Sequence, residues 1–460
     1  MVFSSVTFLF LFLPVSLLLY YLVPQKLKNF VLMLCSLVFY AWGEPVYVLL
    51  MIYSIILNYV SGLLMADHPK YKKQILIFTV ILNLFIIGFF KYYGFLMENF
   101  NALTGLNLTI RKLALPIGIS FYTFQALSYD IDLYRGKFPV QRNFISFAAY
   151  ITMFPQLIAG PIVRYEDIEK QMVKRKLSLS RFGRGAMRFI FGLSKKVLLA
   201  NLVGALFDTI HSSGSDISVV TAWIGAIAYT FQIYFDFSGY SDMAIGLGHM
   251  LGFKFMENFD HPYAAVSVTD FWRRWHISLS TWFREYVYIP LGGNRVSVLK
   301  HIRNILIVWL LTGLWHGASW NFVLWGLYYG LLLLFEKYVW DRIPVPRFIN
   351  RILTMLLVVI GWVIFSSDTL PQILATLSAM FGHAGRGFID SRALYYLSTN
   401  WVLFILCAFC SLPVVKTMHD TMAHNKTGRI VLGILTVLLL FVCTAFMVSQ
   451  SYNPFLYFRF

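Results

Sequence analysis

The sequence predicts an all-α membrane protein that crosses the bilayer many times, and its composition and hydropathy pattern carry the prediction. Of the 460 residues, 58% are hydrophobic and only 13% are charged, and the mean hydropathy is +0.68. Soluble domains carry about 25% charged residues, so this chain cannot cover a water-facing surface. Its apolar runs are long enough for helices that cross the bilayer core. A large soluble protein is therefore excluded.

The apolar runs predict about 10–12 transmembrane helices within a single membrane domain, residues 1–460. The run 5–23 is expected to be a retained first span, because no Lys or Arg precedes Lys26 as a signal peptide requires. The runs are 5–23, 30–42, 46–65, 75–95, 113–131, 185–208, 218–250, 304–335, 351–367, 397–415 and 428–449.

The net charge of +17 arises from 38 Lys and Arg against 21 Asp and Glu. The basic residues lie in the loops between apolar runs, which the positive-inside rule and anionic lipid headgroups explain. Membrane lipids are therefore the expected partners, and nucleic acid is not. The alternation of basic and non-basic loops predicts an N-terminus outside the cell and basic loops in the cytoplasm.

Two runs predict departures from simple spans. The run 145–163 is interrupted by Pro155 and Gly160, as in a re-entrant segment. The run 304–335 has basic residues on both flanks, which favours two helices meeting near Gly317. One long tilted span is the alternative, and both place His316 deep in the membrane.

His316 is the strongest candidate for chemistry. Ionisable groups inside a membrane are rare and by default functional, and His transfers protons near neutral pH. Gly313, Gly317 and Ala318 permit close approach of a substrate or helix. A structural His satisfied by a neighbouring helix is the alternative. Neighbouring Trp315 and Asn321 are candidate substrate contacts.

The segment 260–295 predicts an amphipathic helix at the membrane–cytoplasm interface, beginning at Ser267. Its aromatic face carries Trp272, Trp275, Leu279, Trp282 and Tyr286, and its polar face carries Arg273, His276, Ser280 and Arg284. The helix is either an interfacial anchor or a site where Arg273, Arg274 and Arg284 bind the phosphates of a thioester donor. Arg284 and Trp282 are the candidate donor contacts. On a wetted face, His276 alone is more often structural or positional than catalytic.

Acidic residues also lie inside apolar runs, and they must face a cavity or a partner. Asp236 and Asp242 are candidates to orient a His, with polar contacts between helices as an equal alternative. Gln125, Tyr129, Asp130 and Asp132 favour the structural interpretation. The four cysteines lack metal-type spacing, so no metal site is expected, and no nucleotide-binding loop or metalloprotease motif is present.

These segments resemble the membrane-bound O-acyltransferase superfamily, whose hallmark is Trp-His-Gly in an apolar helix, here Trp315 to Gly317. The sequence is most similar to the branch of alginate O-acetyltransferase membrane subunits. The matching segments are Met1 to Ser5, Phe235 to Tyr240, Asp270 to His276, Tyr288 to Arg295 and Asn453 to Phe460. The resemblance spans essentially the whole chain.

The resemblance implies a ring of tilted helices around a central tunnel in a bacterial inner membrane. It implies acetyl transfer from cytoplasmic acetyl-CoA toward an exported polysaccharide, with no permanently bound cofactor. His316 falls on the catalytic histidine of the family and His276 on its second recurrent histidine, so the resemblance makes both candidate catalytic residues. An extracytoplasmic partner of the SGNH type is also implied.

Two alternatives remain open at the level of sequence. D-alanyl transfer to teichoic acid belongs to a branch that shares the Trp-His-Gly and Asp-Phe-Trp-Arg-Arg-Trp-His elements, here ending at His316–Gly317 and His276. A transporter of an acyl-bearing or lipid-linked intermediate would use Asp236, Asp242 and His316 as a proton relay.

Overall fold

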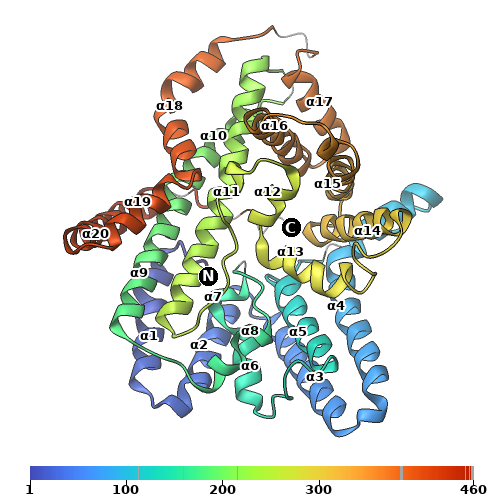
Figure 1. Ribbon diagram of the computed structural model, residues 1–460, viewed down its shortest axis with the longest axis vertical. Coiled ribbons are helices and arrows are strands. Elements are labelled where there is room, and N and C mark those ends of the chain that lie inside the picture. The colour runs from blue at the N-terminus through green and yellow to red at the C-terminus, as the bar shows by residue number, and fades with distance from the viewer. Residues whose placement is uncertain are drawn as a thin grey trace. The chain divides into compact units, whose positions relative to one another are not determined.

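The chain is entirely helical wherever it has regular structure in the described residues, which confirms the predicted all-α class (Figure 1). The computed structural model describes residues 1–111, 113–158, 160–214, 216–383, 387–450, 452–454 and 456. The α-helices are α1 (Leu13–Leu22), α2 (Lys28–Gly43), α3 (Val48–Asp67), α4 (Lys72–Thr104), α5 (Ile119–Tyr134), α6 (Phe144–Thr152), α7 (Phe154–Leu157), α8 (Tyr165–Val173), α9 (Leu179–Ser194), α10 (Asn201–Ser212), α11 (Val219–Met250), α12 (Val268–Arg274), α13 (Ile277–Phe283), α14 (Val298–His316), α15 (Trp320–Tyr338), α16 (Arg347–Ser366), α17 (Leu370–Met380), α18 (Ser391–Ser411), α19 (Val414–Ala423) and α20 (Lys426–Ser449).

Eight helical segments in the described residues are long and apolar enough to cross a membrane. They are Val48–Asp67, Pro69–Thr104, Leu179–Ser212, Val298–His316, Trp320–Arg342, Arg347–Ser366, Ser391–Ser411 and Lys426–Ser449. Shorter apolar helices occupy Phe8–Leu22 and Leu370–Met380. Phe85 and Phe441 on the long helices are 67% and 68% exposed, and lipid solvates such side chains directly. The protein is therefore a multi-pass membrane protein.

The described chain forms two compact units, of which the first comprises Met1–Phe189 and Tyr240–Met256. In this unit α3 packs against α4 through buried polar side chains. Asn83 Nδ2 donates to Asn58 Oδ1 at 2.8 Å, and the Ser61 and Thr79 hydroxyls lie 2.7 Å apart. Such pairs satisfy polar groups that lipid cannot satisfy.

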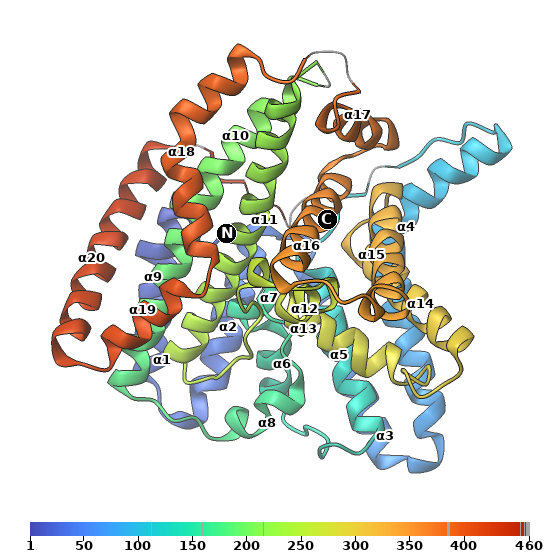
Figure 2. The same ribbon diagram turned by 45° about the horizontal axis from the view of Figure 1, so that its top comes forward.

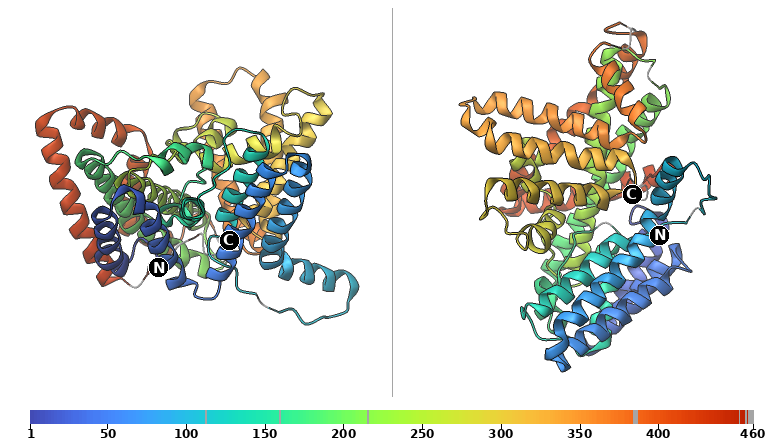
Figure 3. Two further views of the ribbon diagram at one scale, coloured as in Figure 1. Left: turned by 90° about the horizontal axis from the view of Figure 1, so that it is seen from below. Right: turned by 90° about the vertical axis from the view of Figure 1, so that its right-hand side faces the viewer.

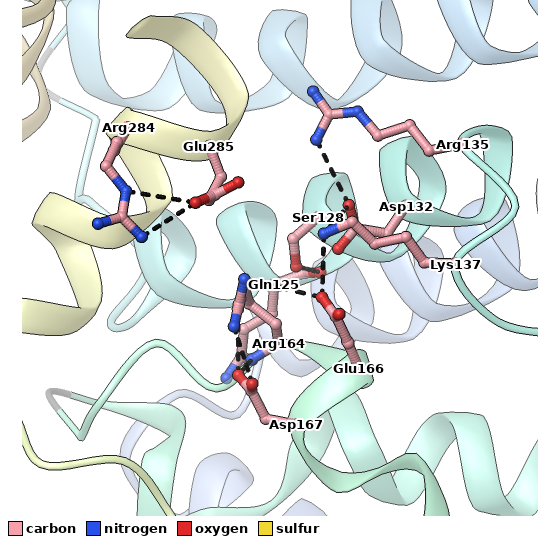
Figure 4. Close-up of polar contacts among 10 residues, drawn as sticks. All are labelled: Gln125, Ser128, Asp132, Arg135, Lys137, Arg164, Glu166, Asp167, Arg284 and Glu285. Atoms are coloured by element: carbon pink, nitrogen blue, oxygen red, sulfur yellow. Dashed lines mark hydrogen bonds and ion pairs between the residues drawn. The ribbon is translucent and has the colours of Figure 1, made fainter. Parts of the chain in front are cut away.

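Two of the four polar residues singled out in α5 make structural contacts, as the sequence favoured, whereas the side chains of Gln125 and Asp130 are buried without a hydrogen-bond partner in the described residues. The Asp132 carboxylate lies 3.2 Å from Lys137 Nζ, which also lies 3.0 Å from Glu166 (Figure 4). The Tyr129 hydroxyl accepts a hydrogen bond from the Gln141 backbone at 3.1 Å. Asp242 is paired too, with Arg188 at 2.9 Å.

The interruption expected within 145–163 is present. Helix α6 ends at Thr152, and the short α7 follows after Met153. Gln156 Nε2 donates to the Tyr150 carbonyl at 2.7 Å, which satisfies backbone freed by the break. The entry and exit of this segment on one side of the membrane stays a prediction.

The second unit comprises Ile190–Gly239 and Glu257–Phe460. Its helices α14 and α15 form a hairpin, and the two helices lie side by side (Figure 2, Figure 3). Helix α14 ends at His316 and α15 begins at Trp320, so the two-helix alternative for 304–335 is confirmed and the single span is wrong.

Two glycines bring the hairpin backbones together. A Cβ atom at Gly313 would lie 2.2 Å from the Phe322 carbonyl oxygen, and one at Gly326 would lie 2.3 Å from that of Trp309. Since both obstacles are backbone atoms, neither can move aside cheaply. This contact sets how α15 lies against the end of α14, where His316 stands.

The substitution Gly326→Ala is expected to force α14 and α15 apart and to lower stability by about 1–3 kcal/mol or more. Thermal unfolding of the purified protein in detergent measures the effect. Gly433→Ala in α20 is the matched control, because a Cβ there meets no atom within 4 Å. Equal melting temperatures for both variants would show that the backbone contact does not constrain the hairpin.

Candidate active site

A narrow pocket in the second unit, with about 360 Å³ of empty space that includes open solvent, lies between aromatic and aliphatic walls. Only two of its lining residues, Asp236 and His316, are ionisable. The residues that line it are Ile233, Asp236, Phe237, Trp275, His316, Trp325, Trp362, Phe365 and Leu456. An apolar pocket with a few convergent polar groups is the usual form of a small-molecule site.

His316 is the last residue of α14, and its side chain is 7% exposed. Its ring lies edge-on to three aromatic rings, with centroid distances of 5.0 Å to Trp315, 5.1 Å to Trp325 and 5.3 Å to Phe365. These contacts restrict the orientation of the imidazole. A single ionisable ring is thus held at the pocket wall, as expected for a group that transfers protons.

Asp236 is held by partners on two distant parts of the chain. Its carboxylate lies 2.6 Å from Lys196 Nζ, with both side chains 3% exposed, and it accepts a hydrogen bond from the Leu456 backbone at 2.9 Å. Lys196 Nζ also donates to the Pro454 carbonyl. The structure therefore places Asp236 and His316 on one pocket without showing a direct contact between them.

The described C-terminal residues, 452–454 and 456, are held by hydrogen bonds to Asp236 and Lys196 and by a further hydrogen bond from Tyr452. The Tyr452 hydroxyl donates to Asp208 Oδ2 of α10 at 2.6 Å, and Leu456 lines the pocket. Sequence reasoning missed both Lys196 and this segment as site elements. The available signal was a lysine inside the apolar run 185–208, which needs a buried partner.

The single amphipathic helix predicted for 260–295 is wrong. The Ser267 cap is confirmed, since its hydroxyl accepts from the Asp270 backbone at 3.0 Å. The chain then breaks at His276, whose φ of 46° separates α12 from α13. A residue in the left-handed region interrupts helical hydrogen bonding, so the two expected faces do not continue past this point.

His276 also departs from its expected wetted face, since it is only 1% exposed. It lies outside the candidate spans, and burial lowers the pKa of its imidazole to about 3. The ring is therefore neutral at physiological pH. Its centroid lies 4.6 Å from that of Phe237 and 5.8 Å from that of Trp315. His276 does not line the pocket itself but packs against Phe237, which does.

The aromatic residues expected on the lipid-facing side are buried inside the unit. Trp272 packs against Trp309 at 4.7 Å and Tyr329 at 4.8 Å between centroids. Trp275 lines the pocket, and Trp282 packs against Tyr286 at 5.1 Å. Trp275 therefore forms part of the pocket wall, and Trp272 and Trp282 pack inside the unit in place of the expected surface anchor.

The expected arginine contacts lie off the pocket lining. Arg273 is exposed, Arg274 pairs with Asp270 at 2.8 Å, and Arg284 pairs with Glu285 at 3.0 Å (Figure 4). Each guanidinium still has donors for a phosphate-bearing ligand.

Asn321 is buried in the first turn of α15, and its Nδ2 donates to the Phe365 carbonyl at 3.4 Å. Asn321 thus steadies a pocket wall. No group of three or more His, Cys, Asp or Glu is placed to hold a metal ion within the residues that the structure describes.

The arrangement suits proton transfer in a water-poor site. A neutral imidazole can take a proton from a hydroxyl. The Asp236 carboxylate in the same pocket attracts the positive charge that results, although Lys196 already offsets much of its negative charge. The apolar walls strengthen that interaction because the local dielectric is low.

Comparison with known proteins points to one family. Residues 137–369 match the model described as the membrane-bound O-acyltransferase family. The chain is 42% identical to the probable alginate O-acetylase AlgI of Pseudomonas putida over 486 aligned residues, covering all of both chains. It is 33% identical to the peptidoglycan O-acetyltransferase of Helicobacter pylori, covering 100% of this chain and 98% of that protein. The chain is 28% identical to the teichoic acid D-alanyltransferase of Bacillus subtilis, over a region that covers 54% of this chain and 68% of that protein.

The substitution Lys196→Met is expected to destabilise the protein by about 3–5 kcal/mol, because it leaves the Asp236 carboxylate buried without its cation. The double variant Lys196→Met/Asp236→Asn is expected to recover much of that loss. Detergent unfolding of the four members of this cycle measures the coupling. Arg142→Met, which breaks the exposed pair with Asp67, is the control and should change stability by about 1 kcal/mol or less. Additive losses in the cycle would contradict the pairing.

Proposed function

Because the chain belongs to the membrane-bound O-acyltransferase family, in the alginate O-acetyltransferase branch, we propose that this O-acyltransferase uses His316 to transfer acetyl groups. The donor is acetyl-CoA from the cytoplasm, and the acetyl group moves toward hydroxyls of an exported polysaccharide. The observation that carries this proposal is the placement of His316 and Asp236 on one apolar pocket.

The proposed reaction requires a general base and a pocket that excludes water and aligns the two substrates. Neutral His316 takes the proton from the acceptor hydroxyl as its oxygen attacks the thioester carbon. The new C–O bond forms, the C–S bond breaks, and the proton passes from His316 to the departing thiolate. Aromatic walls exclude water that would hydrolyse the thioester, and the pocket aligns the reactants. An acyl-His316 intermediate is the alternative route.

The other site residues take supporting roles in this proposal. His276 belongs to the proposed catalytic site as the residue that positions His316, since both rings contact Trp315. Asp236 and Asn321 shape the pocket. Arg273, Arg274, Arg284 and Trp282 remain the proposed contacts for the donor.

The relatives favour acetyl transfer over D-alanyl transfer. Full-length similarity is to proteins named as O-acetylating enzymes, whereas the teichoic acid D-alanyltransferase matches about half of this chain. Membership of an acyltransferase family sets the transporter alternative aside.

The resemblance supports further parts of the proposal. We place the protein in the bacterial inner membrane, with its helices in a ring around a tunnel that joins the two sides. An extracytoplasmic partner of the SGNH type completes transfer to the polysaccharide. No cofactor is bound permanently in this scheme.

A deletion strain complemented with wild type is expected to regain acetyl esters on its exported polysaccharide, and one complemented with His316→Ala is not. Acetyl content per sugar is measured after equal membrane levels of the proteins are confirmed. His424→Gln, which changes an exposed histidine, is the control and should restore acetylation. Full acetylation with His316→Ala would refute the assigned role. Loss of D-alanyl esters in the deletion strain, with unchanged acetylation, would favour the D-alanyl alternative.

A further inference from the structure

Two cations are buried side by side in the first unit, and neither lines the pocket. Lys28 is the first residue of α2 and is 5% exposed, and Arg175 follows α8 and is 7% exposed. Lys28 Nζ lies 4.5 Å from the centroid of the Tyr20 ring, and the Arg175 guanidinium carbon lies 5.7 Å from the same centroid. Like charges placed this close repel, so the pair needs compensation.

No carboxylate compensates this pair among the residues that the structure describes. Lys28 Nζ donates to the Tyr20 carbonyl at 2.6 Å, and Arg175 Nη2 donates to Asn29 Oδ1. Of the three acids of α8, all of which the structure describes, Glu166 pairs with Lys137, Asp167 pairs with Arg164, and Glu169 forms no ion pair with Lys28 or Arg175.

Arg175 has hydrogen-bond donors that form no hydrogen bond within the part of the chain that the structure describes. Its Nε and Nη1 atoms are buried without a hydrogen-bond partner in the described residues. The Phe253 ring, 4.6 Å from the guanidinium carbon, attracts the charge but accepts hydrogen bonds only weakly. The Tyr20 hydroxyl donates its proton to the Leu251 carbonyl at 2.7 Å, and its oxygen attracts the guanidinium charge without forming a hydrogen bond to Nε or Nη1. The three N–H groups on Nε and Nη1 therefore have no hydrogen-bond acceptor among the described residues.

The surroundings attract anions. Lys26, Lys174 and Lys176 flank the buried pair in sequence and are exposed. The pair sits where the turn between α1 and α2 meets the end of α8, in loops that the charge pattern places at the cytoplasmic surface. Anionic lipid headgroups lie at this level and attract such basic segments.

We propose that Lys28 and Arg175 form a binding site for a phosphate-type oxyanion, supplied by the headgroup of an anionic phospholipid. The planar guanidinium fork binds two phosphate oxygens at once, and the Lys28 ammonium supplies a second charge. The site ties the first two helices to the loop after α8 when the lipid is bound. It is separate from the acyl-transfer pocket and does not depend on the proposed reaction.

The test measures thermal unfolding of the full-length protein in detergent with three probes: phosphatidylglycerol, phosphatidylcholine and inorganic phosphate. Phosphatidylglycerol is expected to raise the melting temperature of wild type more than phosphatidylcholine does. The double variant Lys28→Gln/Arg175→Gln should lose that difference. The control Lys26→Gln/Lys174→Gln removes the same charge from exposed positions and should keep it.

Further variants and probes separate the outcomes. Arg175→Lys keeps the charge but loses the fork, so its apparent affinity for phosphatidylglycerol should fall about tenfold, a result that stands even if the double variant does not fold. A matching response to inorganic phosphate supports the oxyanion site and makes free phosphate a second source. An equal response of wild type and Arg175→Lys, or no preference of wild type for phosphatidylglycerol over phosphatidylcholine, overturns the proposal.

Discussion

The backbone contact between α14 and α15 is the constraint on which the site depends. At Gly313 and Gly326 the two helices approach so closely that a single added methyl group would meet a carbonyl oxygen. Lipid offers no hydrophobic force between helices, so such close packing must supply the association. Helix α14 ends at His316 because the backbone of Gly317 is extended, and the contact carries Trp325 of α15 to the same pocket. The position of the imidazole thus follows from a steric requirement several residues away.

Burial of charge is the second organising feature, and it appears in two forms. Around Asp236, the carboxylate, Lys196 and the backbone of the C-terminal segment satisfy one another, so the ion pair also closes part of the pocket. Around Lys28 and Arg175 two cations share a site with no described acid. The ion pair of opposite charges stabilises the folded structure. The two like charges favour binding of an anionic ligand, because an uncompensated buried charge is costly.

Much of the fold could be predicted from local sequence patterns, but contacts between residues far apart in the sequence could not. The hairpin at Gly317, the cap at Ser267 and the depth of His316 follow from charge, capping chemistry and hydropathy within a few residues. The break at His276 did not, because aromatic residues continue at helical spacing across it while one φ of 46° ends the helix. The contact of Asp236 with Leu456 joins residues 220 apart, and no local pattern encodes that pairing.

The most direct test of the central claim follows acyl transfer in lipid vesicles that contain the protein and its extracytoplasmic partner, with labelled acetyl-CoA and an acceptor polysaccharide. Wild type and His316→Gln are compared at equal folded amounts, as judged by thermal unfolding. If His316 is the general base, the substitution lowers kcat by about 10²- to 10⁴-fold, while the KM for acetyl-CoA changes little. A variant that folds and transfers acetyl groups at the wild-type rate would contradict the account.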